Sequence, residues 1–376
     1  MQYFIKVLLS LNLICFIILL SAEHGTAQSV EASFIFGEEV ILEGISGAAL
    51  QEDALFVLTS AEPYIHKFNL RDSSSYSSWG RKGNGPGEVN NPIDIELADN
   101  SIYLLDLRPG ACKLIQYNQQ GVIISEYPLN RVGIKMCYRF EFGSGFKLLE
   151  IGRFAERERH LVLLDDNSNR LDTLTVLLEP ASKKVLVPEG PMRSWNFTDP
   201  FIPAPYWSLS ENGKLYYWSG EEEYISISGL RTNNISKLKT SEKAILISVS
   251  DIDFFIDKRF PLNGKPLFGH KNPYRHLRGK IKKELEESNS EFFPLVNSIK
   301  IDPLGNIWML KASKADGQIW SSLSENGSET TYKFTKGKTV MVFGKMYIAM
   351  RSKNELNDDI IELYDREKIL EQSKMN

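Results

Sequence analysis

The feature that most constrains this chain is a repeated unit of short strands separated by polar turns. The strands are runs of β-branched and aromatic residues, and the turns are rich in Gly, Asn, Asp and Ser, an alternation typical of all-β folds. The clearest strands are Ala54–Leu58, Ser101–Leu105, Lys214–Trp218 and Asn306–Leu310. A polar turn precedes each of them, and another short strand precedes that turn, at Gly47–Leu50, Ile93–Leu97, Tyr206–Leu209 and Ser298–Ile301.

Two further strands complete the unit in its first two copies. A third strand covers Ile65–Asn69 in one copy and Leu114–Asn118 in the other, and a fourth covers Tyr76–Trp79 and Ile123–Tyr127. Four strands at a spacing of roughly 45–50 residues are typical of a β-propeller blade. One blade cannot bury both faces of its sheet, so blades must stack around a ring. We therefore predict an all-β, six-bladed β-propeller of four-stranded antiparallel blades, with seven blades as the alternative.

The last blade is predicted to take one strand from the start of the chain. The C-terminal region offers only three strands, at Thr339–Phe343, Met346–Met350 and Ile360–Tyr364. The strand-like segment Glu31–Phe36 has no other assigned partner. Pairing it with the last blade would close the ring and remove exposed sheet edges, which are prone to aggregation.

Two short helical insertions are predicted between blades 4 and 5. Ser250 followed by Asp253 is the pattern of a helix N-cap, and three apolar residues then share one face: Ile252, Phe255 and Ile256. The second segment, Tyr274–Glu287, places apolar residues four apart among charged ones, which indicates an amphipathic helix. We interpret its charges as a solvated face, with partner binding as the alternative.

The first 27 residues have the pattern of a cleaved secretory signal. Met1–Lys6 carries a positive charge, Val7–Ala22 is almost wholly apolar, and small residues precede the end at Ala27. The alternative, a transmembrane anchor, needs about 20 apolar residues, and this run is shorter and interrupted by polar ones. We predict cleavage after Ala27, a periplasmic, secreted or cell-surface location without stable membrane insertion, and one propeller domain over residues 28–376.

The composition favours neither nucleic-acid binding nor metal chemistry. The formal net charge is −4, so no basic surplus exists to attract nucleic acid. The histidines after the signal lack the close spacing of metal ligands, and they are His66, His160, His270 and His276. No Gly-x-Ser-x-Gly motif is present, and no cysteine stands beside an evident base. We predict neither metal nor cofactor.

Two cysteines, Cys112 and Cys137, remain after signal cleavage. An exported location would permit one disulfide between them. Both lie in apolar strand-like contexts, so two buried free thiols are at least as well supported.

The stretch Trp79–Glu88 holds four glycines and one proline between two predicted strands. Glycines permit positive φ or close backbone approach, proline fixes φ, and the glutamate can accept hydrogen bonds from loop amides. We predict a structural loop that depends on Gly80, Gly83, Gly85, Pro86, Gly87 and Glu88. The alternative is a phosphate-binding loop, but such loops end in Gly-Lys-Ser/Thr and lead into a helix, whereas this one ends in Gly-Glu and leads into a strand.

Binding residues are expected at the rim of the central channel, because loops from every blade converge there on a rigid ring. The candidates near strand ends are Arg81, Lys82, Asp106, Arg108 and Trp207. Structural roles are the alternative: Trp207 in packing between blades, and Asp106 with Arg108 as an ion pair.

The glycine-rich loop Gly80–Glu88 resembles the G-x-x-G-x-G-P-G-E signature of secreted bacterial six-bladed β-propellers related to NHL-repeat and TolB-like propellers. In that family the loop ends the first blade. Asp302–Trp308 resembles the family's D-x-x-G-x-(I/L)-W blade entry, and Tyr206–Gly213 resembles its mid-chain blade. Second strands often end in Asp in such repeats, and here only Asp106 keeps it, which argues against a ligand site built from a ring of aspartates.

We predict a non-catalytic module that binds a protein or a small-molecule or carbohydrate ligand and acts as a monomer. The first alternative is an enzyme sited in the channel, either a metal-dependent lactonase-like hydrolase or an NHL-type lyase. The second is a structural component of the cell surface.

Overall fold

A computed structural model of the protein describes residues 30–72, 75–108, 110–152, 158–165, 167–178, 180, 183–186, 194–220, 222–230, 234–240, 245–260, 275–288, 290–324 and 326–375. Ala32–Asn376 forms one compact unit. The predicted signal, Met1–Ala27, lies outside the described residues.

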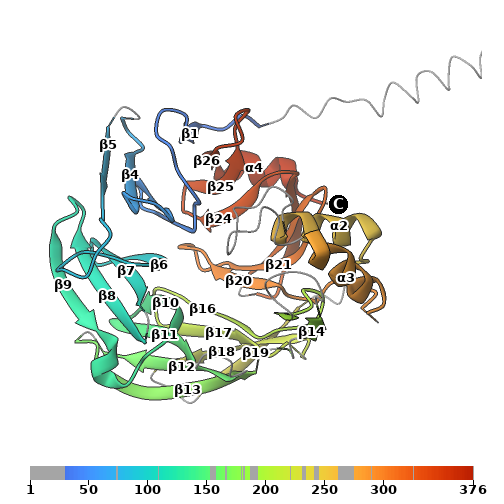
Figure 1. The fold of residues 1–376 in the computed structure, drawn as a ribbon, viewed down its shortest axis with the longest axis horizontal. Coiled ribbons are helices and arrows are strands. Elements are labelled where there is room, and N and C mark those ends of the chain that lie inside the picture. The colour runs from blue at the N-terminus through green and yellow to red at the C-terminus, as the bar shows by residue number, and fades with distance from the viewer. Residues whose placement is uncertain are drawn as a thin grey trace, which may run out of the picture. The chain divides into compact units, whose positions relative to one another are not determined.

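Six four-stranded antiparallel sheets form a ring, so the predicted six-bladed β-propeller is confirmed (Figure 1). Blade 1 contains β2 (Gly47–Leu50), β3 (Ala54–Leu58), β4 (Ile65–Asn69) and β5 (Tyr76–Trp79). Blade 2 contains β6 (Pro92–Ala98), β7 (Ser101–Arg108), β8 (Ala111–Asn118) and β9 (Ile123–Pro128). Blade 3 contains β10 (Cys137–Gly143), β11 (Phe146–Gly152), β12 (Glu158–Leu164) and β13 (Arg170–Leu178).

The second half of the chain supplies the other three blades. Blade 4 contains β16 (Tyr206–Leu209), β17 (Lys214–Trp218), β18 (Tyr224–Gly229) and β19 (Ile235–Lys239). Blade 5 contains β20 (Ser298–Ile301), β21 (Ile307–Lys314), β22 (Gly317–Leu323) and β23 (Glu329–Thr335). Blade 6 contains β24 (Thr339–Phe343), β25 (Tyr347–Lys353), β26 (Asp359–Asp365) and β1 (Phe34–Phe36).

The first strand of each blade in the ring, from β2 to β24, lies on the inside. β2 contacts β6 and β24, β6 contacts β10, and both β10 and β20 contact β16. Figure 1 shows most of these strands around the centre. The second strand β3 is buried along its whole length, whereas the outermost strand β5 is mostly exposed. The sequences of second strands are therefore continuous apolar runs, because neighbouring blades cover both faces of these strands.

The predicted closure of the ring is confirmed. β1 pairs antiparallel with β26, with Phe34 opposite Leu363 and Phe36 opposite Ile361. The N-terminal strand is therefore the outermost strand of the last blade. Phe36 is buried, and its ring packs 4.7 Å from that of Phe68 in blade 1. Backbone pairing thus completes the last blade, and side-chain packing of Phe36 joins it to the first blade.

Both predicted helical insertions are present between blades 4 and 5. They are α2 (Val249–Arg259) and α3 (Arg275–Glu286), which pack against each other. The apolar face of α3 is buried, through Leu277, Ile281 and Leu285. In this structure that face packs within the protein, and a partner is not needed to cover it. Of the helices in the described ranges, none is long and apolar enough to cross a membrane.

The N-cap of α2 is Ser248, so the prediction of Ser250 was wrong by two residues. The Ser248 hydroxyl accepts a hydrogen bond from the Asp251 N–H, and the Asp251 carboxylate accepts one from the Ser248 N–H at 2.9 Å. Asp253, the expected capping carboxylate, instead forms an ion pair with Lys282 of α3. Two serine–aspartate pairs at the same spacing overlap here, and packing of α2 on α3 selects the first.

Four short elements outside the six blades were not predicted from the sequence. They are the 3₁₀ helix η1 (Leu129–Val132), the hairpin of β14 (Lys183–Leu186) and β15 (Ser194–Phe197), and α4 (Arg366–Ser373). Each is too short for a clear hydrophobic period, which is the signal that separates helices from strands.

Cys112 and Cys137 are both buried free thiols in this structure, which agrees with the free-thiol alternative. Burial is the main cause that raises the pKa of the Cys137 thiol, and the neighbouring Cys112 thiol adds to it.

Candidate functional site

The inside of the ring encloses a cavity of about 200 Å³. Residues from the first strand of every blade line it, at the end where that strand turns into the second one. The charged and hydroxyl side chains among the described lining residues come from blades 2 to 5: Glu96, Arg139, Glu141, Ser208, Ser210, Glu211, Lys300 and Asp302. A small cavity with several converging charges on rigid strands is the usual form of a ligand site.

Arg139 and Glu141 lie two residues apart on β10 and so point to the same face of the strand. The Arg139 guanidinium donates to the Glu141 carboxylate and, at 2.9 Å, to the Trp207 carbonyl. Glu141 also accepts from the Ser208 hydroxyl at 3.1 Å and from the Leu209 N–H. Both charges are therefore satisfied within the protein, and they join blade 3 to blade 4.

Trp207 holds Arg139 in place from outside the cavity. Its indole ring lies under the Arg139 guanidinium, 4.7 Å from the ring centroid. Its indole N–H donates to the Glu150 carboxylate at 2.8 Å, and the side chain is only 1% exposed. The candidate Trp207 thus packs between blades 3 and 4 and touches a residue of the channel without lining the cavity itself.

Asp94 links blade 2 to blade 3 next to this cluster. Its carboxylate accepts hydrogen bonds from the Ile95 and Phe140 N–H groups, each at 3.1 Å. Burial raises the pKa of Asp94 to about 6, although the Phe140 N–H and Arg139 oppose the rise. Protonation of Asp94 is therefore coupled to the charges that line the channel.

Stability should respond to Asp94 in a defined direction. A carboxyl whose pKa rises from 3.8 to about 6 on folding binds its proton more tightly in the native state. Its favourable contribution is therefore present below about pH 4 and lost as the pH rises through about 6. We expect the stability of wild type relative to Asp94→Asn to fall over this range in urea titrations. A difference that stayed constant or grew with pH would contradict this assignment.

Glu96 and Lys300 differ from the other charges of the channel. In the described part of the chain, neither side chain makes a hydrogen bond or an ion pair. They belong to blades 2 and 5, which are opposite one another in a ring of six. Burial raises the pKa of Glu96 well above its usual value, and Asp94 and Glu141 add to the rise. Burial and then Arg139 lower the pKa of Lys300.

The channel cavity adjoins a second cavity of about 330 Å³ at the same end of the ring. The two share four lining residues, Leu50, Glu211, Pro303 and Gly344. The outer cavity is otherwise lined by turns between the first and second strands of blades 1 and 6. A ligand would therefore reach Glu96 and Lys300 from the face that carries these turns.

The glycine-rich loop connects β5 of blade 1 to β6 of blade 2. It lies at the start of β6, where Pro92 pairs with Asp106, whereas the cavity lies toward the end of the same strand. The loop and the cavity are thus at opposite ends of the inner strand.

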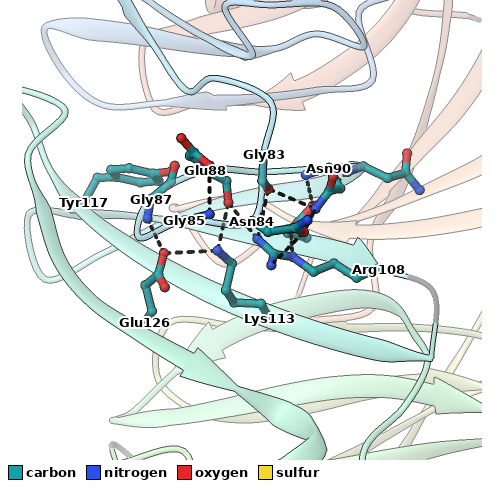
Figure 2. Close-up of polar contacts among 12 residues, drawn as sticks. Gly83, Asn84, Gly85, Gly87, Glu88, Asn90, Arg108, Lys113, Tyr117 and Glu126 are labelled. Atoms are coloured by element: carbon teal, nitrogen blue, oxygen red, sulfur yellow. Dashed lines mark hydrogen bonds and ion pairs between the residues drawn. The ribbon is translucent and has the colours of Figure 1, made fainter.

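Glu88 organises the loop with its side chain and its carbonyl (Figure 2). Its carboxylate accepts the Gly85 N–H at 2.7 Å and pairs with Arg81 at 2.9 Å. The Gly85 N–H is the main cause that lowers the pKa of Glu88, and Arg81 adds to it. Its carbonyl accepts from Arg108 and from Lys113, each at 2.8 Å. These contacts hold the loop against blade 2.

Asp106 and Arg108 hold the other side of the loop. Asp106 is fully buried and accepts the Asn90 and Asn91 N–H groups, each at 2.8 Å. Its second oxygen pairs with Arg108 at 2.8 Å. Arg108 also donates to the Gly83 carbonyl at 3.4 Å. The two residues therefore form the structural ion pair that was the alternative to ligand binding.

The structure brings four of the five predicted binding residues together around the loop and places none of the five in the lining of the channel cavity. Arg81 pairs with Glu88, and its side chain is 80% exposed. The Lys82 N–H donates to the Glu62 carboxylate. Their role in binding a ligand stays a prediction.

Sequence reasoning missed the charges of the inner strands. Glu96 stands between Ile95 and Leu97, and Lys300 between Ile299 and Ile301. A charge alternating with apolar residues in the first strand of a blade was a usable signal, because that strand faces the channel. Metal ligation has no comparable candidate: in the described ranges, no group of three or more His, Cys, Asp or Glu is arranged to hold an ion.

Solved structures resemble this chain in fold. A Bacteroides fragilis protein classed as exported matches with a TM-score of 0.50 and 13% identity, over 89% of this chain and 93% of that one. A member of the DUF4221 family from Bacteroides vulgatus matches with a TM-score of 0.47 and 10% identity, over 90% of this chain and 98% of that one. A streptogramin B lyase matches with a TM-score of 0.41 and 10% identity, over 88% of this chain and 87% of that one. At such identities the likeness shows the propeller fold alone. No protein-family model and no curated protein sequence matches.

Proposed function

We propose that this chain is an exported β-propeller that binds a small polar ligand in its central channel and does not react with it. Glu96 and Lys300 carry the proposal, because they face the channel from opposite blades and, among the described residues, make no hydrogen bond or ion pair. Both side chains are half-buried. A charge that is partly removed from water without an ion pair is costly unless something compensates it, so such groups mark functional sites. A ligand with an anionic group would pair with Lys300 and accept a hydrogen bond from protonated Glu96.

Three observations support export and the family assignment. Met1–Ala27 has the pattern of a secretory signal, and Gly80–Glu88 resembles the loop of secreted propellers related to NHL-repeat and TolB-like proteins. One protein of similar fold is classed as exported. The exported location and this narrower family remain part of the proposal.

Calorimetric titration with small carboxylates, amino acids and neutral sugars tests the binding role. The best ligand is expected to bind Lys300→Met at least about tenfold more weakly, since one hydrogen bond to a charged group contributes about 1.5–3 kcal/mol. Removing a half-buried charge that has no ion pair should not lower the melting temperature. Lys333→Met is the matched control, because Lys333 lies on the outermost strand of the same blade and pairs with Asp316. Equal binding to wild type and Lys300→Met would contradict the proposal.

One observation favours an enzyme as the second candidate. The pKa of Glu96 is raised while that of Lys300 is lowered, so both shift toward the neutral range in which general acids and bases work. Incubating the best ligand with excess protein and following it by NMR separates the two functions: an unchanged ligand supports binding alone, and a new product supports catalysis. A stoichiometric metal ion in the purified protein would favour the lactonase-like alternative, and co-purification with envelope proteins a structural role.

A further inference from the structure

A separate cavity of about 370 Å³ lies beside α2, away from the channel. Four phenyl rings dominate its lining, from Phe201, Phe254, Phe255 and Phe293. The Phe201 and Phe293 rings meet edge to face with centroids 5.4 Å apart, and the Phe201 and Phe255 centroids are 6.3 Å apart. The cavity thus presents ring faces and edges to whatever fills it, an arrangement that aromatic rings favour. Its volume is within the range of small-molecule sites.

Two cations line this cavity without a counterion. Lys258 and Arg259 are exposed at the end of α2 and, among the described residues, make no ion pair. The Lys258 ammonium lies over the Phe254 ring, 5.8 Å from its centroid. Partial burial, and then the Arg351 guanidinium, lower the pKa of Lys258. Arg351 itself pairs with Asp359. The cavity therefore combines an apolar interior with two cations at its edge that have no acidic side chain as a partner among the described residues.

Asp251, the one carboxylate among the described lining residues, is already engaged. Asp251 pairs with Lys314 at 3.1 Å and accepts the Ser248 N–H at 2.9 Å and the Ala315 N–H at 3.2 Å. Its charge is therefore balanced by the helix cap and by β21, and it does not offset the two cations. A ligand that complements this cavity needs an apolar ring and one negative charge.

We propose that this cavity binds a small aromatic carboxylate, with its ring among the four phenylalanines and its carboxylate on Lys258 and Arg259. The site is independent of the channel, since the two cavities share no described lining residue. The aromatic lining selects the ring over an aliphatic chain, and the two cations select the acid over its amide.

Calorimetry with phenylacetate tests this proposal, with phenylacetamide and hexanoate as probes of the charge and of the ring. Phenylacetate is expected to bind wild type, and the two other compounds at least about tenfold more weakly. The double variant Lys258→Gln/Arg259→Gln should lose about tenfold or more in phenylacetate affinity, because it removes the charged partners of the carboxylate. Lys283→Gln is the matched control, as Lys283 lies on the exposed face of α3 and is 73% exposed.

The same titrations contain the results that would overturn the site. Any one of three results would do so: phenylacetate does not bind up to about 10 mM, the double variant binds phenylacetate as tightly as wild type, or hexanoate binds as tightly as phenylacetate. Lys300→Met distinguishes the two cavities. It should leave phenylacetate affinity unchanged, whereas a loss there would place the acid in the channel and remove this proposal while leaving the channel proposal intact.

Discussion

A variant that lacks residues 30–37 is expected to melt at least about 10 °C below wild type. The deletion removes β1, leaves the backbone groups of β26 unpaired and takes Phe36 out of the contact between blades 6 and 1. Loss of one buried phenylalanine side chain alone costs about 3–5 kcal/mol. Each kcal/mol lowers the melting temperature of a large domain by roughly 2–4 °C. Differential scanning calorimetry of the purified variant measures the effect.

Two single variants separate packing from strand pairing in the same element. Phe36→Ala keeps the backbone pairs and should lower the free energy of unfolding by about 3–5 kcal/mol. Ile35→Ala is the control, because Ile35 is 46% exposed and its loss should cost less than about 1 kcal/mol. A deletion variant with the wild-type melting temperature would show that β1 does not close the ring.

The double variant Gly83→Ala/Gly87→Ala is expected to lower the free energy of unfolding by about 3 kcal/mol. Both glycines have positive φ, +156° and +69°, and positive φ costs roughly 1–2 kcal/mol for an alanine in the left-handed region. A Cβ at Gly83 would lie 2.0 Å from the Glu88 carboxylate, which is anchored by Gly85. One at Gly87 would lie 2.0 Å from Ile123 of β9. Urea denaturation measures the change.

Gly133→Ala is the matched control for the loop variant. Gly133 also has positive φ, +81°, but nothing lies within 4 Å of a Cβ built there. Gly133→Ala should therefore lower the free energy of unfolding only by the cost of a positive φ. That cost is less than half of the change expected for the double variant. If the double variant kept the stability of wild type and lost a bound ligand, the phosphate-cradle interpretation of the loop would return.

Much of the fold was predictable because the relevant signals are local. The turn that begins at Asp302 is an example: its carboxylate accepts the Leu304 and Asn306 N–H groups at 2.9 Å and the Trp308 indole N–H at 2.7 Å. The D-x-x-G-x-x-W pattern therefore encodes one turn within seven residues, with Gly305 at a positive φ of +83°. Repeats of such turns and strands are visible in a single sequence.

The channel charges were not predictable to the same degree, because their meeting depends on ring closure. Glu96 and Lys300 come from blades that the sequence places far apart, and their side chains converge only when six inner strands surround one axis. The predicted residues Asp106 and Arg108 stand at strand ends as expected, but the loop that they hold lies at the other end of the inner strand. Which end opens into a cavity is a property of packing.

The most direct test of the channel site is a crystal structure of the protein with the tightest-binding small carboxylate from the titrations. The account predicts density for the ligand inside the ring, with its anionic group at hydrogen-bond distance from the Lys300 ammonium and a polar atom beside Glu96. Ligand density at the glycine-rich loop with an empty channel would contradict it.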